Sequence, residues 1–297
     1  MPTVDIIIPC YNAQNIIKQC IHSVMHQKYN NQINIYLIND GSTDDTLKIL
    51  NSFIDYPNIH IINNPTNAGR SVTRNKGIFS GNGEVLLFLD SDMTVQTNWV
   101  ESHIKILEYD NVVGVVGDYK LPTNQTPNKL DKYLYHPKRG ARKFKNNAHI
   151  PFRYFLFSNT AIKREVFNVV GPFNENIIEY GGEDTDLAIR IWEKFPHKLK
   201  FTNQATSEHH NNKTIYEFYN SMYIYGNKNL PLLLKKYSHY KNDLGGQYIH
   251  SIIGYLIFNP IIRLIIKIMN RVITNYWLSR YIVIDCVIRG ARNAKNI

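Results

Sequence analysis

Val85-Leu-Leu-Phe-Leu-Asp90-Ser-Asp92 is the stretch of sequence that decides the fold, because an apolar run fit for a buried strand ends abruptly in two carboxylates. The two acids stand at the point where such a strand would reach a crevice. A strand end of this kind can hold a hard divalent cation and the phosphates that the cation bridges. The plainer interpretation is that Asp90 and Asp92 are turn residues after a strand.

Strands and helices alternate around this stretch. Strands are predicted at 4–8, where Pro9 stops the strand, and at 33–38, 59–62, 85–89 and 112–116; helices are predicted at 15–26, 43–53 and 71–80. This order predicts an α/β fold with a mostly parallel central sheet. In such sheets ligands sit outside the carboxyl ends of the strands, which here are residues 9–11, 40–42 and 90–92.

Composition and length bound the class of protein. A chain of 297 residues that is 43% hydrophobic can form one large domain, or one domain with an appendage. Three cysteines make no disulfide framework, which favours a reducing compartment, and no signal peptide is recognised at the N-terminus. The polar, basic segment 118–150 is predicted to be a long loop or lid, and its basic run 138–145 is either a solvated loop or a site for an anionic acceptor or a pyrophosphate lipid.

The last sixth of the chain differs in character from the rest. Residues 247–297 supply +6 of the net charge of +10, from Arg263, Lys267, Arg271, Arg280, Arg289, Arg292 and Lys295 against Asp285. The apolar segment 249–269 is interrupted by polar and basic residues, whereas a spanning helix needs about 20 mostly apolar ones. The pattern predicts a helix pair that lies in a membrane interface and is attracted by anionic lipid. The alternatives are a helical cap on the core and an oligomer contact.

Two further polar clusters follow the strand-end acids. The first is Gly181-Gly-Glu183-Asp184-Thr-Asp186, and the second is the histidine pair His209-His210. An apolar helix face begins directly after Asp184, so this acid is also a candidate helix N-cap. Trp192 on that face is interpreted as helix core, with an acceptor platform as the alternative.

Five segments of residues 1–225 resemble, in order, the motifs of family 2 inverting glycosyltransferases of the GT-A fold. They are Pro9-Cys-Tyr11-Asn12, Asn39-Asp40-Gly41-Ser42-Thr43-Asp44, Gly69-Arg-Ser-Val-Thr-Arg74-Asn75-Lys-Gly77, Asp90-Ser-Asp92 and Gly182-Glu183-Asp184. The Gly-Gly-Glu-Asp segment also resembles the acceptor-side motif of galactosyl- and N-acetylgalactosaminyltransferases, including bacterial chondroitin-type polymerases. The resemblance implies a GT-A domain at 1–225, and the change of composition predicts a helical, basic extension at 226–297.

The resemblance implies roles for the residues of the nucleotide pocket. Tyr11 would lie near a uracil ring, Asp40 would accept a hydrogen bond from the base, and Arg74 would face the base or the diphosphate. Asp90 would contact the ribose or the metal. The whole set implied for the nucleotide is Pro9, Tyr11, Asn12, Asp40, Arg74, Asp90 and Ser91.

The resemblance also implies a metal site and a general base. Asp92 would bind Mn²⁺ or Mg²⁺ directly, with Asp90 beside it, and His209 would complete the site. We favour His209 over His210, because alternation along a short strand would direct only one of the pair to the site. Asp184 would be the general base, and Glu183 is the alternative base.

These residues predict the transfer of a single sugar of the galactose, GalNAc or GlcNAc type from a UDP-sugar to a saccharide. A Gln-x-x-Arg-Trp segment and a multi-span membrane domain are absent from the sequence, which favours single transfer over polymer extrusion. The acceptor is expected to be lipid-linked, and the protein to lie on the cytoplasmic face of the cell membrane. A homo-oligomer is left open.

Two other classes of function compete with this prediction. A nucleotidyltransferase would share the α/β nucleotide site and the metal, but it usually has a Gly-rich phosphate loop near its N-terminus. A non-catalytic binder of membranes or nucleic acid would fit the pI of about 9.3. The basic excess lies in an apolar tail without stacking aromatics on a strand face, so no nucleic-acid partner is predicted.

Overall fold

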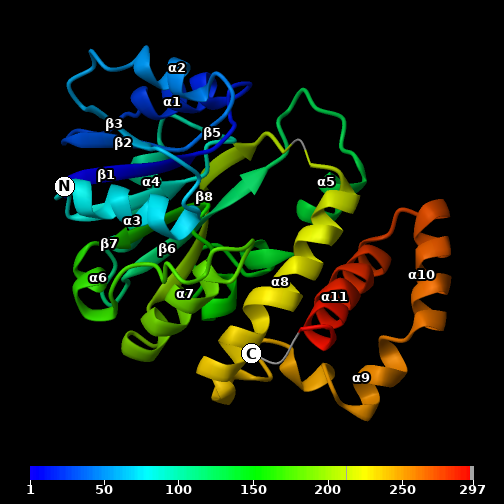
Figure 1. Cartoon of the computed structure of the whole chain (residues 1–297). Coiled ribbons are helices and arrows are strands. Elements are labelled where there is room, and N and C mark those ends of the chain that lie inside the picture. Colours follow the sequence, from blue (N-terminus) through cyan, green and yellow to red (C-terminus); the bar gives the residue numbers. More distant parts are fainter. Residues whose placement is uncertain (212, 295–297) are drawn as a thin grey trace. The chain divides into compact units, whose positions relative to one another are not determined.

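A computed structural model of the chain describes residues 1–211 and 213–294 (Figure 1). The chain divides into two compact units. The α/β unit comprises residues 1–124, 140–178 and 183–211, and the helical unit comprises 125–139, 179–182 and the described part of 212–297. This division gives the helical unit more of the chain than the predicted range 226–297, which stays a prediction. Lys295, counted above among the basic residues, lies outside the described residues.

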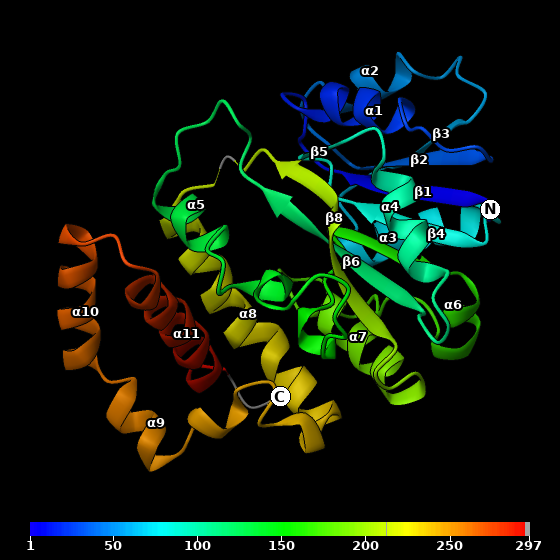
Figure 2. The ribbon, with the colours of Figure 1, turned by 180° about the vertical axis from the view of Figure 1, so that it is seen from behind.

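Eight strands of the α/β unit form one sheet in the order β3-β2-β1-β4-β7-β6-β8-β5 (Figures 1 and 2). Their bounds are β1 (Val4–Cys10), β2 (Ile33–Asp40), β3 (Ile59–Asn64), β4 (Val85–Leu89), β5 (Met93–Val95), β6 (Gly114–Lys120), β7 (Asn159–Lys163) and β8 (Leu199–His209). Strands β3, β2, β1 and β4 pair in parallel, as do β6 and β8. Strand β7 is antiparallel to β4 and β6, and β5 is antiparallel to β8. The predicted mostly parallel sheet is therefore confirmed.

Helices connect the strands of this unit and cover the sheet. They are α1 (Ile17–Met25), α2 (Thr46–Asn51), α3 (Arg70–Ser80), α4 (Trp99–Leu107), α6 (Glu165–Val170) and α7 (Glu183–Lys194), with 3₁₀ turns η1 (Gly140–Lys143) and η2 (Phe152–Tyr154). The apolar positions of α1, spaced three and four apart, are Ile17, Cys20, Ile21 and Val24, and all are buried. They pack in one core with the apolar residues of β1, β2 and β4.

Two predictions about elements are wrong. Pro9 does not stop the first strand, since β1 continues to Cys10. Strand β4 pairs only as far as Ile7, so β1 has a neighbour on one side at Pro9, where a proline is tolerated. The segment 118–150 is not one long loop, because it contains the end of β6, η1 and the helix α5 (Lys129–Leu134).

A fully buried amide joins four elements of the α/β unit. The Asn159 side chain of β7 accepts hydrogen bonds from Trp99 Nε1 (2.8 Å) and contacts His103 Nε2 (3.0 Å), both on α4. Its Nδ2 donates to the carbonyl oxygens of Asp118 in β6 (2.8 Å) and Ala205 in β8 (3.0 Å). Burial lowers the pKa of His103 to about 4, so this ring is neutral when folded.

The helical unit consists of α5, α8 (Ile215–Lys236), η3 (Ser238–Tyr240), η4 (Gly246–Tyr248), α9 (Ile252–Ile257), α10 (Pro260–Val272) and α11 (Tyr276–Arg292). Helix α8 starts with a capping box, in which Thr214 and Glu217 each bind the other's backbone N–H. Two small cores hold the unit together, one around Phe218 and Val283 and one around Leu230 and Ile288. In the described ranges 1–211 and 213–294, no helix combines the length and the apolar composition needed to cross a bilayer.

Candidate active site

A buried arginine gathers three carboxylates in the α/β unit. Arg74 of α3 is 1% exposed, and its Nη1 lies 2.7 Å from Asp184 Oδ1 and 3.5 Å from Glu183 Oε1. Its Nη2 lies 3.3 Å from Asp90 Oδ1 and donates to the carbonyl oxygen of Phe157 (3.2 Å). Burial on its own lowers the pKa of Arg74, but Asp184, Asp90 and Glu183 together outweigh it and raise the pKa. The strand-end acid Asp90 and the acids at the start of α7 are therefore brought to one point.

The two acids at the start of α7 have different surroundings. Asp184 is partly exposed and accepts hydrogen bonds at both oxygens, from Arg74 and from the Phe157 N–H (3.2 Å). Glu183 is buried, and its Oε2 has no hydrogen-bond partner among the described residues. Burial, with a smaller contribution from Asp184, raises the pKa of Glu183. Asp186, the third acid of the predicted cluster, is buried against Arg190 (3.0 Å) and takes no part in this group.

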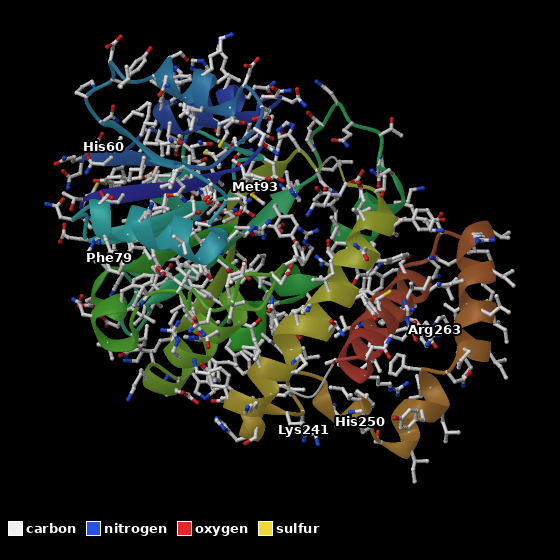
Figure 3. All side chains as sticks on the ribbon, viewed as in Figure 1. His60, Phe79, Met93, Lys241, His250 and Arg263 are labelled. Carbon is white, nitrogen blue, oxygen red and sulfur yellow. The ribbon has the colours of Figure 1, made fainter. Side chains whose placement is uncertain are left out.

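Asp92 and His209 form the second half of the site. The His209 Nε2 lies 3.2 Å from Asp92 Oδ2. Strand β5 starts at Met93 and pairs with β8, so that Met93 stands opposite His209. The label Met93 in Figure 3 marks this part of the sheet. The His210 ring contacts Thr94 Oγ1 instead (3.0 Å), so the two histidines point to different partners. Burial raises the pKa of Asp92, but the hydrogen bond and the charge of His209 outweigh it, and the pKa is lowered.

Three of the residues predicted to face a nucleotide, Tyr11, Asn12 and Asp40, lie at the ends of β1 and β2. Tyr11 is 48% exposed, so its ring is open to a ligand rather than part of the core. Asn12 has a left-handed backbone (φ 47°), and its Oδ1 accepts a hydrogen bond from the Thr43 N–H (2.8 Å). Asp40 is buried and accepts hydrogen bonds from Asn64 Nδ2 (2.8 Å) and from the Ala68 and Gly69 N–H groups (2.9 and 3.1 Å).

The structure places the remaining predicted residues as follows. Pro9 lies within β1 and Ser91 in the turn after β4, and both are half-buried. Gly41, next to Asp40, has φ +66°, and a Cβ there would stand 2.4 Å from the backbone of Thr66. Only glycine fits this close approach, so Gly41 sets the course of the chain beside Asp40.

Sequence reasoning missed three contributors to the site. The backbone of Phe157 supplies an N–H to Asp184 and a carbonyl to Arg74, which no side-chain pattern reveals. Tyr119 of β6 meets the His209 ring edge to face at 6.0 Å, and the Arg142 guanidinium lies 4.7 Å from the centre of the Tyr119 ring. The sequence placed Arg142 only within a basic run of the predicted loop. No sequence pattern indicated that it contacts Tyr119.

The Asp92 and His209 pair offers one oxygen and one nitrogen ligand of the kind that a divalent cation accepts. Asp92 Oδ1 is buried and has no hydrogen-bond partner among the described residues. The other carboxylate oxygen, Oδ2, contacts the imidazole nitrogen of His209. In the described part of the chain, no group of three or more His, Cys, Asp or Glu side chains is arranged to hold a metal by itself. Asp90 is bound to Arg74 rather than gathered with the pair. A cation here would therefore need diphosphate oxygens and water to complete its shell.

Comparison with known proteins assigns most of the chain to a family. Residues 5–171 match the family described as "Glycosyl transferase family 2", which is more than half of the chain. Residues 136–216 match the "N-terminal domain of galactosyltransferase". A protein of Haemophilus influenzae called "Uncharacterized glycosyltransferase" is 36% identical over 120 residues, covering 40% of this chain and 48% of that protein. The chain spans about half the length of the curated relatives it matches.

Two solved structures show the same fold. The mannosyltransferase PcManGT of Pyrobaculum calidifontis, in complex with GDP-Man and Mn²⁺, has a TM-score of 0.66 at 14% identity, over 97% of this chain and 87% of that one. A fragment of S. aureus TarS in complex with UDP-GlcNAc has a TM-score of 0.57 at 14% identity, over 97% and 90%. The prediction of a GT-A-like α/β fold with C-terminal helices is confirmed.

Proposed function

We propose that this chain, which belongs to glycosyl transferase family 2, transfers a single sugar from a nucleotide sugar to a saccharide with inversion at the anomeric carbon. One observation carries the proposal. Arg74 draws Asp90 at the end of β4 and Asp184 at the start of α7 to the same guanidinium, 3.3 and 2.7 Å away. We assign Asp90 to the donor side and Asp184 to the acceptor side of the proposed reaction, since ligands of such sheets bind at the carboxyl ends of the strands.

The donor side is proposed to hold a UDP-sugar over the ends of β1, β2 and β4. Tyr11 is exposed where a base could stack, and Asp40 has used three of its acceptor positions, which leaves one for a base N–H. The S. aureus relative with UDP-GlcNAc and the Pyrobaculum relative with GDP-Man both bind nucleotide sugars. The galactosyltransferase match over 136–216 supports a sugar of the galactose, GalNAc or GlcNAc type.

Mn²⁺ or Mg²⁺ bound by Asp92 and His209 would supply Lewis-acid neutralisation of the leaving diphosphate. The residues of the chain would bind the cation, position the carboxylates and supply positive charge. Asp92 presents the unpartnered Oδ1, and His209 is held against it by the Tyr119 ring. Arg74 holds Asp90 at the end of β4 and adds positive charge near the strand end where the diphosphate would lie.

Asp184 is the proposed general base. Both its oxygens already accept one hydrogen bond, and each keeps a second lone pair for the hydroxyl proton of the acceptor. Glu183 is the rival, because its unpartnered Oε2 and raised pKa make it a ready proton acceptor once it is ionised. A base in this position contributes roughly 10²–10⁴-fold to the rate.

The acceptor is proposed to be a saccharide carried on a membrane lipid, and the protein to work at the cytoplasmic face of the membrane. The apolar and basic character of α9 and α10 supports this part of the proposal. That the chain has no nucleic-acid partner, and that it could form a homo-oligomer, stay predictions from the sequence.

The test measures UDP release with Mn²⁺ across a panel of UDP-sugars, with water as the default acceptor. We expect slow, metal-dependent hydrolysis of one donor by the wild-type chain. Asp184→Asn is expected to lower that rate by roughly 10²–10⁴-fold while UDP binding is retained. Glu183→Gln is the matched variant, one residue away on the same helix, and is expected to keep the rate within about tenfold.

The two variants also decide between the two acids. Loss of turnover in Glu183→Gln with a retained rate in Asp184→Asn would assign the base to Glu183. Absence of UDP binding and of turnover with either metal would contradict the proposed reaction as a whole.

A further inference from the structure

The two faces of α10 are reversed relative to an ordinary surface helix. Its exposed face is apolar throughout and carries Ile261, Leu264, Ile265, Ile268 and Val272, of which Val272 is 82% exposed. Its inward side includes two polar residues among half-buried isoleucines. Asn270 is 3% exposed, and Arg263 bonds the buried Asp285 of α11 (2.6 Å). A helix in water normally turns these faces the other way.

The exposed apolar surface continues from α10 onto α9. Ile252, Ile253 and Leu256 of α9 are exposed as well. In Figure 3 the labelled Arg263 lies on the side of α10 toward α11, and side chains of the opposite side project freely. An apolar patch of this extent marks an interaction site, because its exposure to water is unfavourable.

The charges around this patch identify what covers it. Lys267, Arg271 and Arg280 are exposed beside the apolar face, and the single acid among residues 247–297 is the buried Asp285. By sequence the helical unit holds 16 Lys and Arg against five Asp and Glu, a formal charge of +11, which leaves −1 for the α/β unit. A second copy would bring like charges together, whereas an anionic bilayer supplies both an apolar phase and opposite charge.

A pocket of about 350 Å³ opens next to this face, between α8, α10 and α11. Its α8 wall carries Tyr219 and Tyr223, its α11 wall carries Arg289, and Lys267 reaches it from α10. The Asp285 carboxylate is shared by Arg263 (2.6 Å) and Arg289 (3.3 Å), and Lys267 makes no ion pair with any described residue.

Two cations, Lys267 and Arg289, line this pocket, and no acidic residue is among its lining residues. Phenol hydroxyl groups on the α8 wall add hydrogen-bond donors. A phosphate that carries an apolar tail matches this combination of charge, donors and neighbouring apolar surface.

We propose that this pocket binds the phosphate group of an anionic membrane lipid, while the apolar face of α9 and α10 lies among the acyl chains of the same leaflet. The inference rests on the membrane part of the proposed function and deepens it. It is independent of the sugar-transfer reaction, so UDP release without vesicles reports on that reaction separately.

The experiment is flotation of the full chain with vesicles of phosphatidylcholine alone and with vesicles that contain about one third phosphatidylglycerol. We expect binding to the anionic vesicles and at least roughly tenfold weaker binding to the neutral ones. Lys267→Glu should weaken binding to the anionic vesicles by roughly thirtyfold, since two units of charge change near the surface. Lys48→Glu makes the same change on an exposed lysine of α2 and should leave binding within about twofold.

The apolar face is tested by the double variant Ile265→Ser/Ile268→Ser. Its binding should fall by roughly a hundredfold, because two exposed isoleucines would no longer enter the acyl region. Ile54→Ser/Ile178→Ser is the matched control on exposed isoleucines of the α/β unit, and it should bind as the wild type does. UDP release in the absence of vesicles should be unchanged in all four variants.

Four results would overturn the proposal. The wild-type chain could remain in solution with both kinds of vesicle. Lys267→Glu and Lys48→Glu could weaken binding equally, which would mean diffuse attraction without a site. Inorganic phosphate alone could bind as tightly as the vesicles do, which would assign the pocket to a soluble anion. Ile265→Ser/Ile268→Ser could change the oligomeric state and leave vesicle binding intact, which would assign the face to a second copy.

Discussion

Replacement of Arg74 by methionine should destabilise the α/β unit strongly, because the guanidinium is the shared partner of three carboxylates. Arg74 is 1% exposed and the Glu183 side chain 5%, so the variant leaves a buried carboxylate without its cation. Removal of one partner of a buried pair costs about 3–5 kcal/mol. Asp184 and Asp90 are more exposed, so the loss of their ion pairs with Arg74 should cost less because water screens them. We expect a loss of about 4 kcal/mol in the free energy of unfolding at neutral pH.

The assay is urea unfolding followed by circular dichroism. Arg70→Met is the control on the same helix, since Arg70 is half exposed and lies 4.0 Å from Glu183; its cost should stay below about 1 kcal/mol. In the double variant Arg74→Met/Glu183→Gln no buried charge is left unpaired at Glu183, so about 2 kcal/mol should return. If Arg74→Met costs less than about 1 kcal/mol, or if the double variant recovers nothing, the reasoning is refuted.

Three further perturbations test other parts of the structure. Burial raises the folded-state pKa of Glu183 above the ordinary 4.5, so ionised Glu183 is unfavourable to folding at neutral pH. Glu183→Gln should therefore raise the free energy of unfolding at neutral pH and lose that gain at acidic pH. Urea titrations at neutral and at acidic pH measure the difference. The folded-state pKa of His103 is lowered from 6.5 to about 4, so the wild type should lose about 2 kcal/mol between neutral pH and about pH 5, and His103→Gln, which can still donate to Asn159, should lose less over the same range. Gly41→Ala should cost at least about 2 kcal/mol in thermal or urea unfolding, whereas Gly140→Ala, with a similar φ but open space around it, should cost about 1 kcal/mol; equal costs would count against the close approach at Gly41.

Much of the α/β unit was predictable because its signals are local. The bounds of β4 match the prediction, and the strands β2 and β3 and the helices α1 and α3 lie where periodicity placed them. Pairing between distant strands is a different matter, since no local pattern sets β7 antiparallel between β4 and β6. Helix α5 was hidden by a Pro-, Asn- and Lys-rich segment, although Asn128 and Asp131 form a capping box at its start.

The candidate site was predictable as a set of strand ends but not as a set of contacts. Asp90, Asp92 and Asp184 could be selected by motif, whereas the contact between Arg74 and Asp184 joins residues 110 positions apart. The motif selected Arg74 for a role at the base or the diphosphate and gave no sign that it binds three carboxylates. The tertiary structure buries this guanidinium, and a buried charge is unfavourable unless carboxylates pair with it. The rings of His209 and His210 point to different partners, as the alternation of a strand predicts, and only the His209 ring contacts the Asp92 carboxylate.

The measurement that tests the central claim most directly is calorimetric binding of UDP in the presence and absence of Mn²⁺, for the wild type, His209→Ala and His210→Ala. We expect the wild type to bind UDP in a Mn²⁺-dependent manner. His209→Ala should bind at least roughly tenfold more weakly, while His210→Ala, altered at the neighbouring residue, should stay within about threefold of the wild type. UDP binding that is indifferent to Mn²⁺, or equal in the two histidine variants, would contradict a metal-dependent donor site at Asp92 and His209.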